Sequence, residues 1–485
     1  MKTLKHISAF LLLVPLLASC HFLEVEKTGK TSIKNFYSDI YALDAAVNGI
    51  YGLTYKFYDN YMVLYPEVAG DLVRLQATTS EWRQQFDFIS DESDETSAVG
   101  YIWKNGYEII ANANEVIQYG PSVSDRFPQQ TASVRNYIAQ AYFIRALVHL
   151  DLSLVYGQTY TYSADGSHLG TAVMTSIPDV KSKIARSSAA VTYKRILDDL
   201  RTASDMFADG WTKGCFYASP AACKALMARV YLYMGNYSEA KKCASEVISD
   251  YGLSLTPRAD YVAMFCGRKE GQEAIFRLNG LSGGSKLGSM FDYNTPSMNP
   301  SSKLMDIFSS DEHSWTGTDI RSELLSYKSS SGDEFSGVCM KFTDTEDIDD
   351  TQKRYDPFVL RLSEMYLIRA EAACHDGDIE TAVSDIATLE ARARGVKASD
   401  INVTFSSIDD LAGIVQRERV KELFLEGHRL FDLTRRHETL SRDAACGSSV
   451  LSMTYPDDRF ILPIPLVELD ANEAMQPNPI NGTQR

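Results

Sequence analysis

The sequence predicts a mainly α-helical protein. In it, tetratricopeptide-like helical hairpins form a right-handed α-superhelical scaffold that carries long loop-rich insertions and few short strands. Apolar residues recur at helical spacing in several long segments. A pattern of small residues also occurs twice, 142 residues apart: Ala228, Gly235, Ala240 and Ala370, Gly377, Ala382. Small residues let two helices approach closely, and the glycine takes the turn between them. Copies so far apart indicate separate hairpins with insertions between them, not a tandem array.

Helical periodicity predicts helices in chain order at residues 38–51, 101–118, 134–157, 191–203 and 417–436. We expect Ser38 to cap the first of them, because a serine before the first apolar turn accepts hydrogen bonds from free backbone N–H groups. Gly157 is expected to end the third helix.

Three long stretches lack clean periodicity, namely residues 52–98, 157–188 and 252–356. The first is rich in aromatic residues and the other two in small and polar residues. We expect all three to be mostly loop, with short strands in the first. Residues 460–469 are apolar but contain two prolines, so we expect an extended segment against the helical core instead of a central strand.

Residues 417–436 combine an apolar helical face with many charges. Glu426, His428 and Arg429 look like a catalytic constellation, but no nucleophile or metal-ligand spacing accompanies His428. We therefore interpret the stretch as one long scaffold helix whose charges form ion pairs. The pairs expected within it are Glu426 with Arg429 and Asp432 with Arg436. The partners expected on a neighbouring helix are Glu364, Arg369 and Glu371.

The N-terminus indicates export. Residues 1–19 have two lysines followed by an apolar run that is too short to span a bilayer, as in a secretory signal. The run ends in Leu17-Ala18-Ser19-Cys20, which resembles the bacterial lipobox. We therefore expect lipidation at Cys20, and acyl chains there would anchor the protein stably to a membrane.

The charge balance limits the class of ligand. Removing residues 1–19 takes away Lys2 and Lys5, so the formal charge changes from −16 to −18. A surface this acidic argues against nucleic acid and anionic lipid as ligands and is compatible with a neutral ligand. Seven cysteines remain after Cys20, scattered and odd in number, so we expect buried thiols and not a disulfide framework.

Motifs for catalysis and metal binding are weak. The sequence has no His-Glu-x-x-His or Walker pattern. The acidic run at residues 344–350 could supply oxygen ligands to Ca²⁺, but it lacks the glycine and terminal glutamate of an EF-hand. A solvated acidic loop is the simpler interpretation, so we expect no cofactor and no metal.

In their order along the chain, these segments resemble the SusD/RagB family of Bacteroidetes nutrient-uptake lipoproteins. The matching pieces are Cys20, Arg145-Ala146 to Tyr156-Gly157, Arg186-Ser187-Ser188, Asp319-Ile320-Arg321, residues 361–371, residues 422–436 and Pro463-Ile464-Pro465. Residues 158–161 and 478–480 depart from the family pattern. Both departures lie in expected loops and affect local geometry more than membership.

The resemblance implies an outer-membrane lipoprotein exposed at the cell surface, without enzymatic activity. Such a protein captures an oligosaccharide or polysaccharide for a partner SusC-like TonB-dependent transporter, and touches the membrane through its N-terminal lipid alone. The resemblance also implies four parts of the chain: a lipoprotein signal peptide (1–19), a tether (20–35), an N-terminal SusD-like region (36–215) and a C-terminal RagB/SusD region (216–485). The last two regions would form one compact unit.

Two alternatives stay open. The same scaffold could capture peptides or another non-glycan nutrient through backbone hydrogen bonds in a roomier, less aromatic groove. The chain could also be a surface glycoside hydrolase, since its 64 acidic residues could supply two positioned carboxylates. A purely structural scaffold is the other form of this second alternative.

Ligand contacts are expected on aromatic residues in the insertions, because a neutral sugar stacks on aromatic rings and forms hydrogen bonds with polar side chains. The aromatic candidates are Trp82, Trp315, Tyr293 and Tyr65. The polar candidates are Asp71, Arg83 and Asn294.

Overall fold

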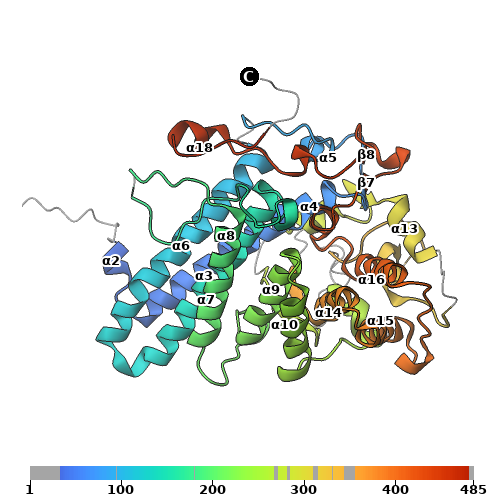
Figure 1. The fold of residues 1–485 in the computed structure, drawn as a ribbon, viewed down its shortest axis with the longest axis horizontal. Coiled ribbons are helices and arrows are strands. Elements are labelled where there is room, and N and C mark those ends of the chain that lie inside the picture. Colours follow the sequence, from blue (N-terminus) through green and yellow to red (C-terminus); the bar gives the residue numbers. More distant parts are fainter. Residues whose placement is uncertain are drawn as a thin grey trace, which may run out of the picture.

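The computed structural model describes residues 33–93, 96–179, 181–266, 271–280, 284–309, 315–329, 331–342 and 355–479. Most of the described chain is helical and the strands are few and short, so the predicted fold class is confirmed (Figure 1). Cys20 and the acidic run at residues 344–350 lie outside the described residues, so their expected roles stay predictions.

Four long helices lie side by side in the N-terminal half: α3 (Ile40–Phe57), α6 (Ala98–Arg126), α7 (Thr131–Tyr156) and α8 (Ala189–Met206) (Figure 1). They confirm four of the predicted helices. The N-cap of α3 is Asp39 and not Ser38, because the Asp39 carboxylate accepts a hydrogen bond from the Ala42 N–H at 3.0 Å. Helix α7 is apolar and long enough to cross a membrane, but 89% of its most apolar window is buried inside the fold.

The two predicted hairpins are present and pack against each other. They are α9 (Pro220–Tyr233) with α10 (Tyr237–Asp250), and α14 (Leu362–Asp376) with α15 (Ile379–Arg394). Their turns use Gly235 at φ 70° and Gly377 at φ 74°, a left-handed conformation that favours glycine. Because α10 contacts α14, the hairpins are neighbours in space although the insertion 252–356 separates them in sequence (Figure 1).

The insertions contain more regular structure than predicted. The shorter helices along the chain are α2 (Ile33–Phe36), α4 (Leu64–Val68), α5 (Arg83–Phe86), α11 (Arg258–Phe265), α12 (Lys286–Met290), α13 (Ser302–Ser309) and α18 (Leu466–Ala471). One π-helix, η2 (Tyr58–Met62), directly continues α3. The 3₁₀ turns are η3 (Pro128–Gln130), η4 (Tyr160–Tyr162), η5 (Ile320–Leu325), η6 (Ala398–Asp400), η7 (Ala444–Cys446) and η8 (Asp458–Phe460). The expectation of loop for residues 52–98 and 252–356 is therefore wrong in part.

Eight short strands form two-stranded antiparallel sheets in the described chain. The pairs are β1 (Val73–Leu75) with β3 (Met298–Pro300), β2 (Ala274–Arg277) with β6 (Phe358–Arg361), β4 (Ser326–Lys328) with β5 (Glu334–Ser336), and β7 (Leu440–Ser441) with β8 (Ser452–Met453). The β1–β3 pair joins the large insertion to a segment far away in sequence, and the β2–β6 pair joins it to the strand that directly precedes α14. They therefore hold the insertion against the helical scaffold.

The predicted helix at residues 417–436 is in fact two helices, α16 (Ile408–Leu423) and α17 (Arg429–Arg435). The chain turns between them, with Leu425 at φ 62° and Gly427 at φ 89°. A side chain at Gly427 would approach the Met62 backbone oxygen to 3.1 Å, so the turn fits closely against η2. The predicted single helix is wrong, because helical periodicity does not reveal a sharp turn that keeps apolar residues inside.

The charges of this stretch pair mostly across the fold. Glu426 accepts hydrogen bonds from Arg361 at 2.8 Å and Lys341 at 2.6 Å, so the predicted pair of Glu426 with Arg429 is wrong. Instead, Arg429 donates to Asp71 at 2.5 Å. The predicted pair of Asp432 with Arg436 is present at 3.8 Å. The predicted partner Glu371 pairs with Arg435 at 2.5 Å, so both predictions are confirmed. Glu364 pairs with Arg229 and Arg369 with Asp385 instead.

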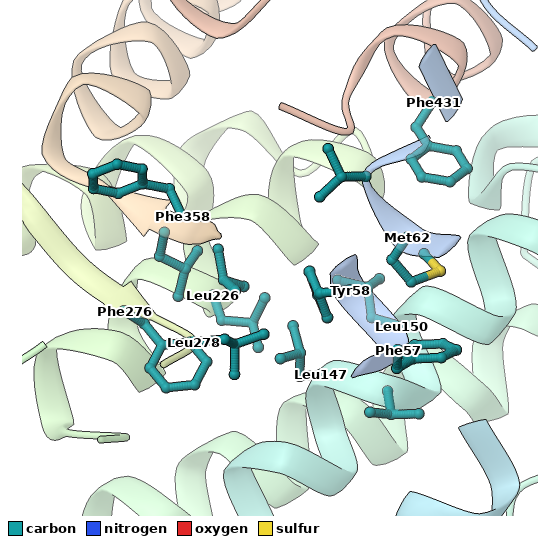
Figure 2. Close-up of a cluster of buried hydrophobic side chains, with 14 of the residues drawn as sticks. Phe57, Tyr58, Met62, Leu147, Leu150, Leu226, Phe276, Leu278, Phe358 and Phe431 are labelled. Carbon is teal, nitrogen blue, oxygen red and sulfur yellow. The ribbon is translucent and has the colours of Figure 1, made fainter. Parts of the chain in front are cut away.

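One hydrophobic cluster contains residues from both sides of position 215 and joins the helical groups. Figure 2 shows its centre, where Tyr58 and Met62 of η2 point inward. The other labelled side chains come from α3, α7, α9, β2 and the residue after it, β6 and α17: Phe57, Leu147, Leu150, Leu226, Phe276, Leu278, Phe358 and Phe431.

The C-terminal segment partly follows its prediction. Residues 461–465 are extended, and the Leu462 N–H donates to the Val155 oxygen of α7 at 2.9 Å. The segment therefore lies against the helical core as expected. Helix α18 begins at Leu466, so the extended prediction is wrong for residues 466–469.

Candidate functional site

A surface hollow of about 380 Å³ lies where η2 meets α12 and the turn that follows it. We call it the polar hollow, and its lining consists of Asn60, Gly284, Ser285, Lys286, Ser289, Asp292 and Thr295. Its volume falls within the range of about 300–1,000 Å³ that is typical of small-molecule sites. Most of its lining side chains carry hydrogen-bonding groups.

Asp59 holds the two sides of the polar hollow together. Its carboxylate accepts hydrogen bonds from the Ser285 hydroxyl at 2.5 Å and the Lys286 N–H at 2.7 Å, across 226 residues of sequence. Burial raises the pKa of Asp59 although these hydrogen bonds oppose the shift. Asp59 therefore positions the start of α12 against η2 and is not itself available to a ligand.

The π-helical turn determines which side chains of η2 face the hollow. Tyr58, Asp59 and Met62 are buried, whereas Asn60 and Tyr61 are partly exposed. Single π-helical turns are rare and occur often at functional sites. Within the described chain, the Asn60 amide forms no hydrogen bond, so its donors and acceptor face the hollow unused.

Two tyrosine rings lie close to the hollow without being among its lining residues, since Tyr61 directly follows Asn60 in η2. Tyr61 stacks on Tyr101 with 6.0 Å between ring centroids, and Tyr101 is 38% exposed. We call Tyr61 and Tyr101 the tyrosine pair. Because aromatic faces attract the C–H faces of sugars, the pair offers an apolar surface beside the polar groups of the hollow.

Trp82 supports the tyrosine pair from behind. Its ring centroid lies 6.3 Å from that of Tyr61, and its side chain is buried. The backbone of Trp82 has φ 64°, a strained conformation for a bulky residue. Its indole Nε1 has no hydrogen-bond partner among the described residues. Trp82 is thus buried beneath the tyrosine pair, and its expected contact with a ligand stays a prediction.

The charged groups at the rim are already arranged for hydrogen bonding. Lys286 Nζ pairs with Glu81 at 2.6 Å and retains further N–H donors, because an ammonium has three. One Asp292 oxygen accepts hydrogen bonds from the backbone N–H groups of Asn294 and Thr295 at 2.9 and 2.8 Å, which fixes the turn. This arrangement suits a ligand with many hydroxyl groups and a partly apolar face.

Two other aromatic candidates occupy the core. Trp315 is 8% exposed, donates its indole N–H to the Asn402 oxygen at 2.9 Å and packs in the cluster around α14–α16. Tyr65 is 1% exposed and packs on Phe431 at 6.4 Å. Both rings are buried and fill space between helices, so a ligand contact at Trp315 or Tyr65 stays a prediction.

Tyr65 also lies at the base of a separate cavity of about 340 Å³. Phe88, Ile89 and the extended segment 461–463 form its walls, and Asp458 lies among the lining residues. Its rings and aliphatic groups come from the scaffold and the C-terminal segment. We regard it as secondary, because it is separate from the half-exposed tyrosine pair.

The remaining candidates lie at the surface or in ion pairs. Tyr293 is half-buried and packs on Tyr327 at 4.6 Å, beside the turn that carries Asp292. Asn294 is exposed in that same turn. Arg83 donates to the Gly447 and Gln76 oxygens at 2.8 and 2.9 Å, so it joins backbone segments.

Asp71 is buried between cations. It accepts hydrogen bonds from Arg429 at 2.5 Å and Lys303 at 2.6 Å, and it is 1% exposed. Although burial alone would raise its pKa, these two charges lower it. Both carboxylate oxygens of Asp71 are used inside the fold, which argues against a ligand contact there.

Sequence reasoning missed Asn60, Tyr61, Tyr101 and Lys286. Tyr61 belongs to the aromatic-rich stretch 52–98, so its composition was a usable signal. Tyr101 lies on a helix, where an aromatic residue ordinarily indicates core packing. Within the described chain, no group of three His, Cys, Asp or Glu side chains could hold a metal ion.

Comparison with known proteins gives consistent matches along the chain. The model of the SusD family matches residues 308–480, and a model described as starch-binding associating with outer membrane matches residues 21–232. SusD-like protein P2 of Formosa agariphila is 24% identical over 98% of this chain and 99% of its own length.

Solved structures share the fold. A SusD superfamily protein of Bacteroides thetaiotaomicron superimposes with a TM-score of 0.79 at 24% identity, covering 91% of this chain and all of the other. A SusD-like carbohydrate binding protein of Bacteroides vulgatus gives 0.74 at 18% identity, covering 92% and 100%. At these identities the likeness establishes the architecture and leaves the ligand open.

Proposed function

The chain belongs to the SusD/RagB family, and from that premise we propose that it binds an oligosaccharide or polysaccharide and delivers it to a SusC-like TonB-dependent transporter. The family is associated with the outer membrane and with glycan binding. For this chain, the polar hollow with its tyrosine pair is the proposed site of capture.

The observation that carries the proposal is the combination of surfaces at one place. Asn60 and Lys286 line the hollow with hydrogen-bonding side chains, and Tyr61, the residue after Asn60, stacks on Tyr101 and supplies an aromatic surface next to that lining. Neutral sugars need both kinds of contact, because they have apolar faces and a rim of hydroxyl groups.

The lining favours binding over hydrolysis. Among the described lining residues, Asp292 alone carries a carboxylate, and one of its oxygens is committed to the turn at residues 292–295. A glycoside hydrolase requires two carboxyl groups on opposite sides of the scissile bond. We therefore propose a capture protein without catalytic activity.

Delivery requires a place at the membrane. We propose that lipid on Cys20 anchors the protein to the outer membrane, with residues 20–35 as a tether and the folded part exposed at the cell surface. Several acyl chains suffice for stable anchoring, since each buried methylene contributes about 0.8 kcal/mol. The transporter would then receive the ligand from this protein, which its lipid anchor holds in the same membrane.

Calorimetric titration against hexasaccharides of the maltose, cellulose, xylan, mannan and laminarin series, and against mixed peptides, tests capture. We expect heat from at least one hexasaccharide, no heat from peptides and no released reducing ends. Affinity purification of the lipidated protein from outer membranes should recover a TonB-dependent barrel. A protein that binds only peptides, or that cleaves its glycan, would contradict the proposal.

A further inference from the structure

A second hollow, larger than the first, lies between the loop after α8 and the loop after α10. We call it the loop groove; it has a volume of about 640 Å³, and Trp211, Cys215, Asp250, Tyr251 and Leu253 are among its lining residues. None of these residues lines the polar hollow. Its volume again falls within the range of small-molecule sites.

One wall of the loop groove is a fixed aromatic ring. Trp211 donates its indole N–H to the Ala218 oxygen at 3.2 Å and stacks on Phe207 with 6.0 Å between centroids and 19° between planes. The Trp211 side chain remains half-exposed. Its orientation is therefore set before any ligand arrives, which reduces the entropy lost on binding.

Another part of the lining combines an exposed ring with a carboxylate. Tyr251 is 37% exposed, and Asp250 beside it is exposed as well. Lys213 is not among the lining residues, and its ammonium lies 5.7 Å from the Trp211 ring centroid and 5.0 Å from that of Tyr217. Among the described lining residues, Asp250 is the one charged side chain, so the groove combines two aromatic rings with one carboxylate.

This chemistry matches the ligand class of the polar hollow. Aromatic walls suit the apolar face of a sugar ring, and the Asp250 carboxylate can accept hydrogen bonds from its hydroxyl groups. An anionic ligand would be repelled by Asp250. A neutral oligosaccharide fits both the rings and the carboxylate.

The loop groove and the polar hollow rest on the same helix. Tyr217 packs on Tyr51 of α3 at 5.6 Å and 82°, and the Tyr51 hydroxyl accepts a hydrogen bond from the Ala218 N–H at 2.9 Å. Asn60 of the polar hollow follows nine residues later on the continuation of α3. That separation is about 14 Å along the axis at about 1.5 Å per residue.

We propose that the loop groove is a second glycan-binding site, which takes a neutral oligosaccharide of the same class as the polar hollow. The inference rests on the proposed function. Two sites on one chain would increase the affinity for a long polysaccharide without improving either site, because the second contact becomes intramolecular.

Binding stoichiometry tests the inference. The chain from His21 onward, which contains every described residue, would be titrated with whichever hexasaccharide of the panel gives heat. We expect two ligands per chain for the wild type and one for Trp211→Ala or Tyr251→Ala. Tyr251→Ala covers the case in which Trp211→Ala fails to fold, because Tyr251 is more exposed. Tyr41→Ala is the matched control, since Tyr41 is 82% exposed and lines neither hollow; it should bind two.

Cys215 provides an independent readout inside the loop groove. It is partly exposed and not in a disulfide, whereas the other described cysteines are buried. The hexasaccharide should slow maleimide modification of Cys215 at least threefold, both in the wild type and in a Tyr61→Ala, Lys286→Ala variant.

The outcomes separate the two proposals. One ligand per chain, lost in the Tyr61→Ala, Lys286→Ala variant, together with an unchanged Cys215 rate would overturn the second site and leave the proposed function intact. If no hexasaccharide binds the wild type, both proposals fail. If binding is lost only with Trp211→Ala and Tyr251→Ala, the loop groove stands and the polar hollow is the wrong site.

Discussion

The buried charges around Arg361 and the polar hollow use the same kinds of side chain for different purposes. Arg361 is 2% exposed and donates to Glu273 at 2.8 Å, Glu422 at 2.6 Å and Glu426 at 2.8 Å. In the polar hollow, Lys286 has one carboxylate partner, Glu81, and both side chains remain partly exposed. The Arg361 guanidinium finds its carboxylate partners inside the protein, whereas the Lys286 ammonium keeps N–H donors that a ligand can use.

The contrast shows that burial decides what a charged residue does here. Burial opposes ionisation of Glu426, yet the charges of Arg361 and Lys341 outweigh it and lower the pKa of the carboxyl. Removing one partner of such a group leaves an uncompensated buried charge, which is costly. A partly exposed ion pair contributes about 1 kcal/mol at most. Mutations in the first region should therefore change stability, and mutations in the second should change affinity.

Arg361→Ala should have the largest effect. Three buried carboxylates lose their shared cation, so we expect the free energy of unfolding to fall by about 3–5 kcal/mol or the protein to be insoluble. Urea denaturation followed by circular dichroism measures the change. Arg459→Ala is the matched control, because Arg459 pairs with Asp457 at the surface and its loss should cost less than about 1 kcal/mol. Equal losses in both variants would contradict the contrast.

Arg429→Ala and Glu426→Ala should also act on stability. Asp71 keeps Lys303 as a partner after the first change, and Arg361 keeps two other carboxylates after the second. We therefore expect each change to lower the free energy of unfolding by about 2–3 kcal/mol. The glycan affinity of the folded fraction should stay unchanged when titrated below the lowered melting temperature. Lost affinity at full stability would assign this turn to the binding site.

Glu67→Gln should change the pH dependence of stability. The Glu67 Oε1 accepts hydrogen bonds from three backbone N–H groups at the start of α17, but burial raises the pKa of the carboxyl to about 7 from an ordinary value of 4.5. Between those values the folded state binds more protons than the unfolded state. The stability that Glu67 provides is therefore complete below pH 4.5 and falls as the pH rises to 7.

The wild type should accordingly lose up to about 3 kcal/mol relative to Glu67→Gln across that interval, since one pKa unit corresponds to about 1.4 kcal/mol. Denaturant titrations of both proteins at pH 4, 5.5, 7 and 8 give the difference directly. A difference that does not vary with pH would show that folding does not shift the pKa of Glu67.

Tyr61→Ala should weaken glycan binding about tenfold, which corresponds to about 1.4 kcal/mol, with little change in melting temperature. The ring is half-exposed and forms one side of the tyrosine pair, so its loss removes ligand contact more than core packing. Tyr41→Ala should bind as the wild type does, because Tyr41 is an exposed aromatic residue away from both hollows. An equal loss in the two variants would remove the tyrosine pair from the site.

The scaffold could be predicted because its signals are local. Helices α3, α6, α7 and α8 follow from apolar periodicity, and Gly235 and Gly377 follow from a small-residue pattern that a hairpin requires. The break between α16 and α17 could not be predicted, because its cause is the close approach of η2 to Gly427. That approach joins residues more than 360 positions apart.

The site was harder to predict than the fold for the same reason. Trp82, Trp315 and Asp71 lie in polar or irregular segments, yet tertiary packing buries all three. The hollow depends on the hydrogen bond between Asp59 and Ser285, which are 226 positions apart, so no local sequence pattern indicates it. The sequence predicts aromatic rings with polar partners, and the structure places such a combination at other residues than the predicted ones.

Hydrogen–deuterium exchange of the wild type with and without the best-binding hexasaccharide tests the location of the glycan most directly. Binding at the polar hollow predicts slower exchange at residues 58–62 and 284–296, with no change in α14, α16 and α17. Slower exchange in those three helices, or only around residues 461–463, with none at the polar hollow, would contradict the proposed site.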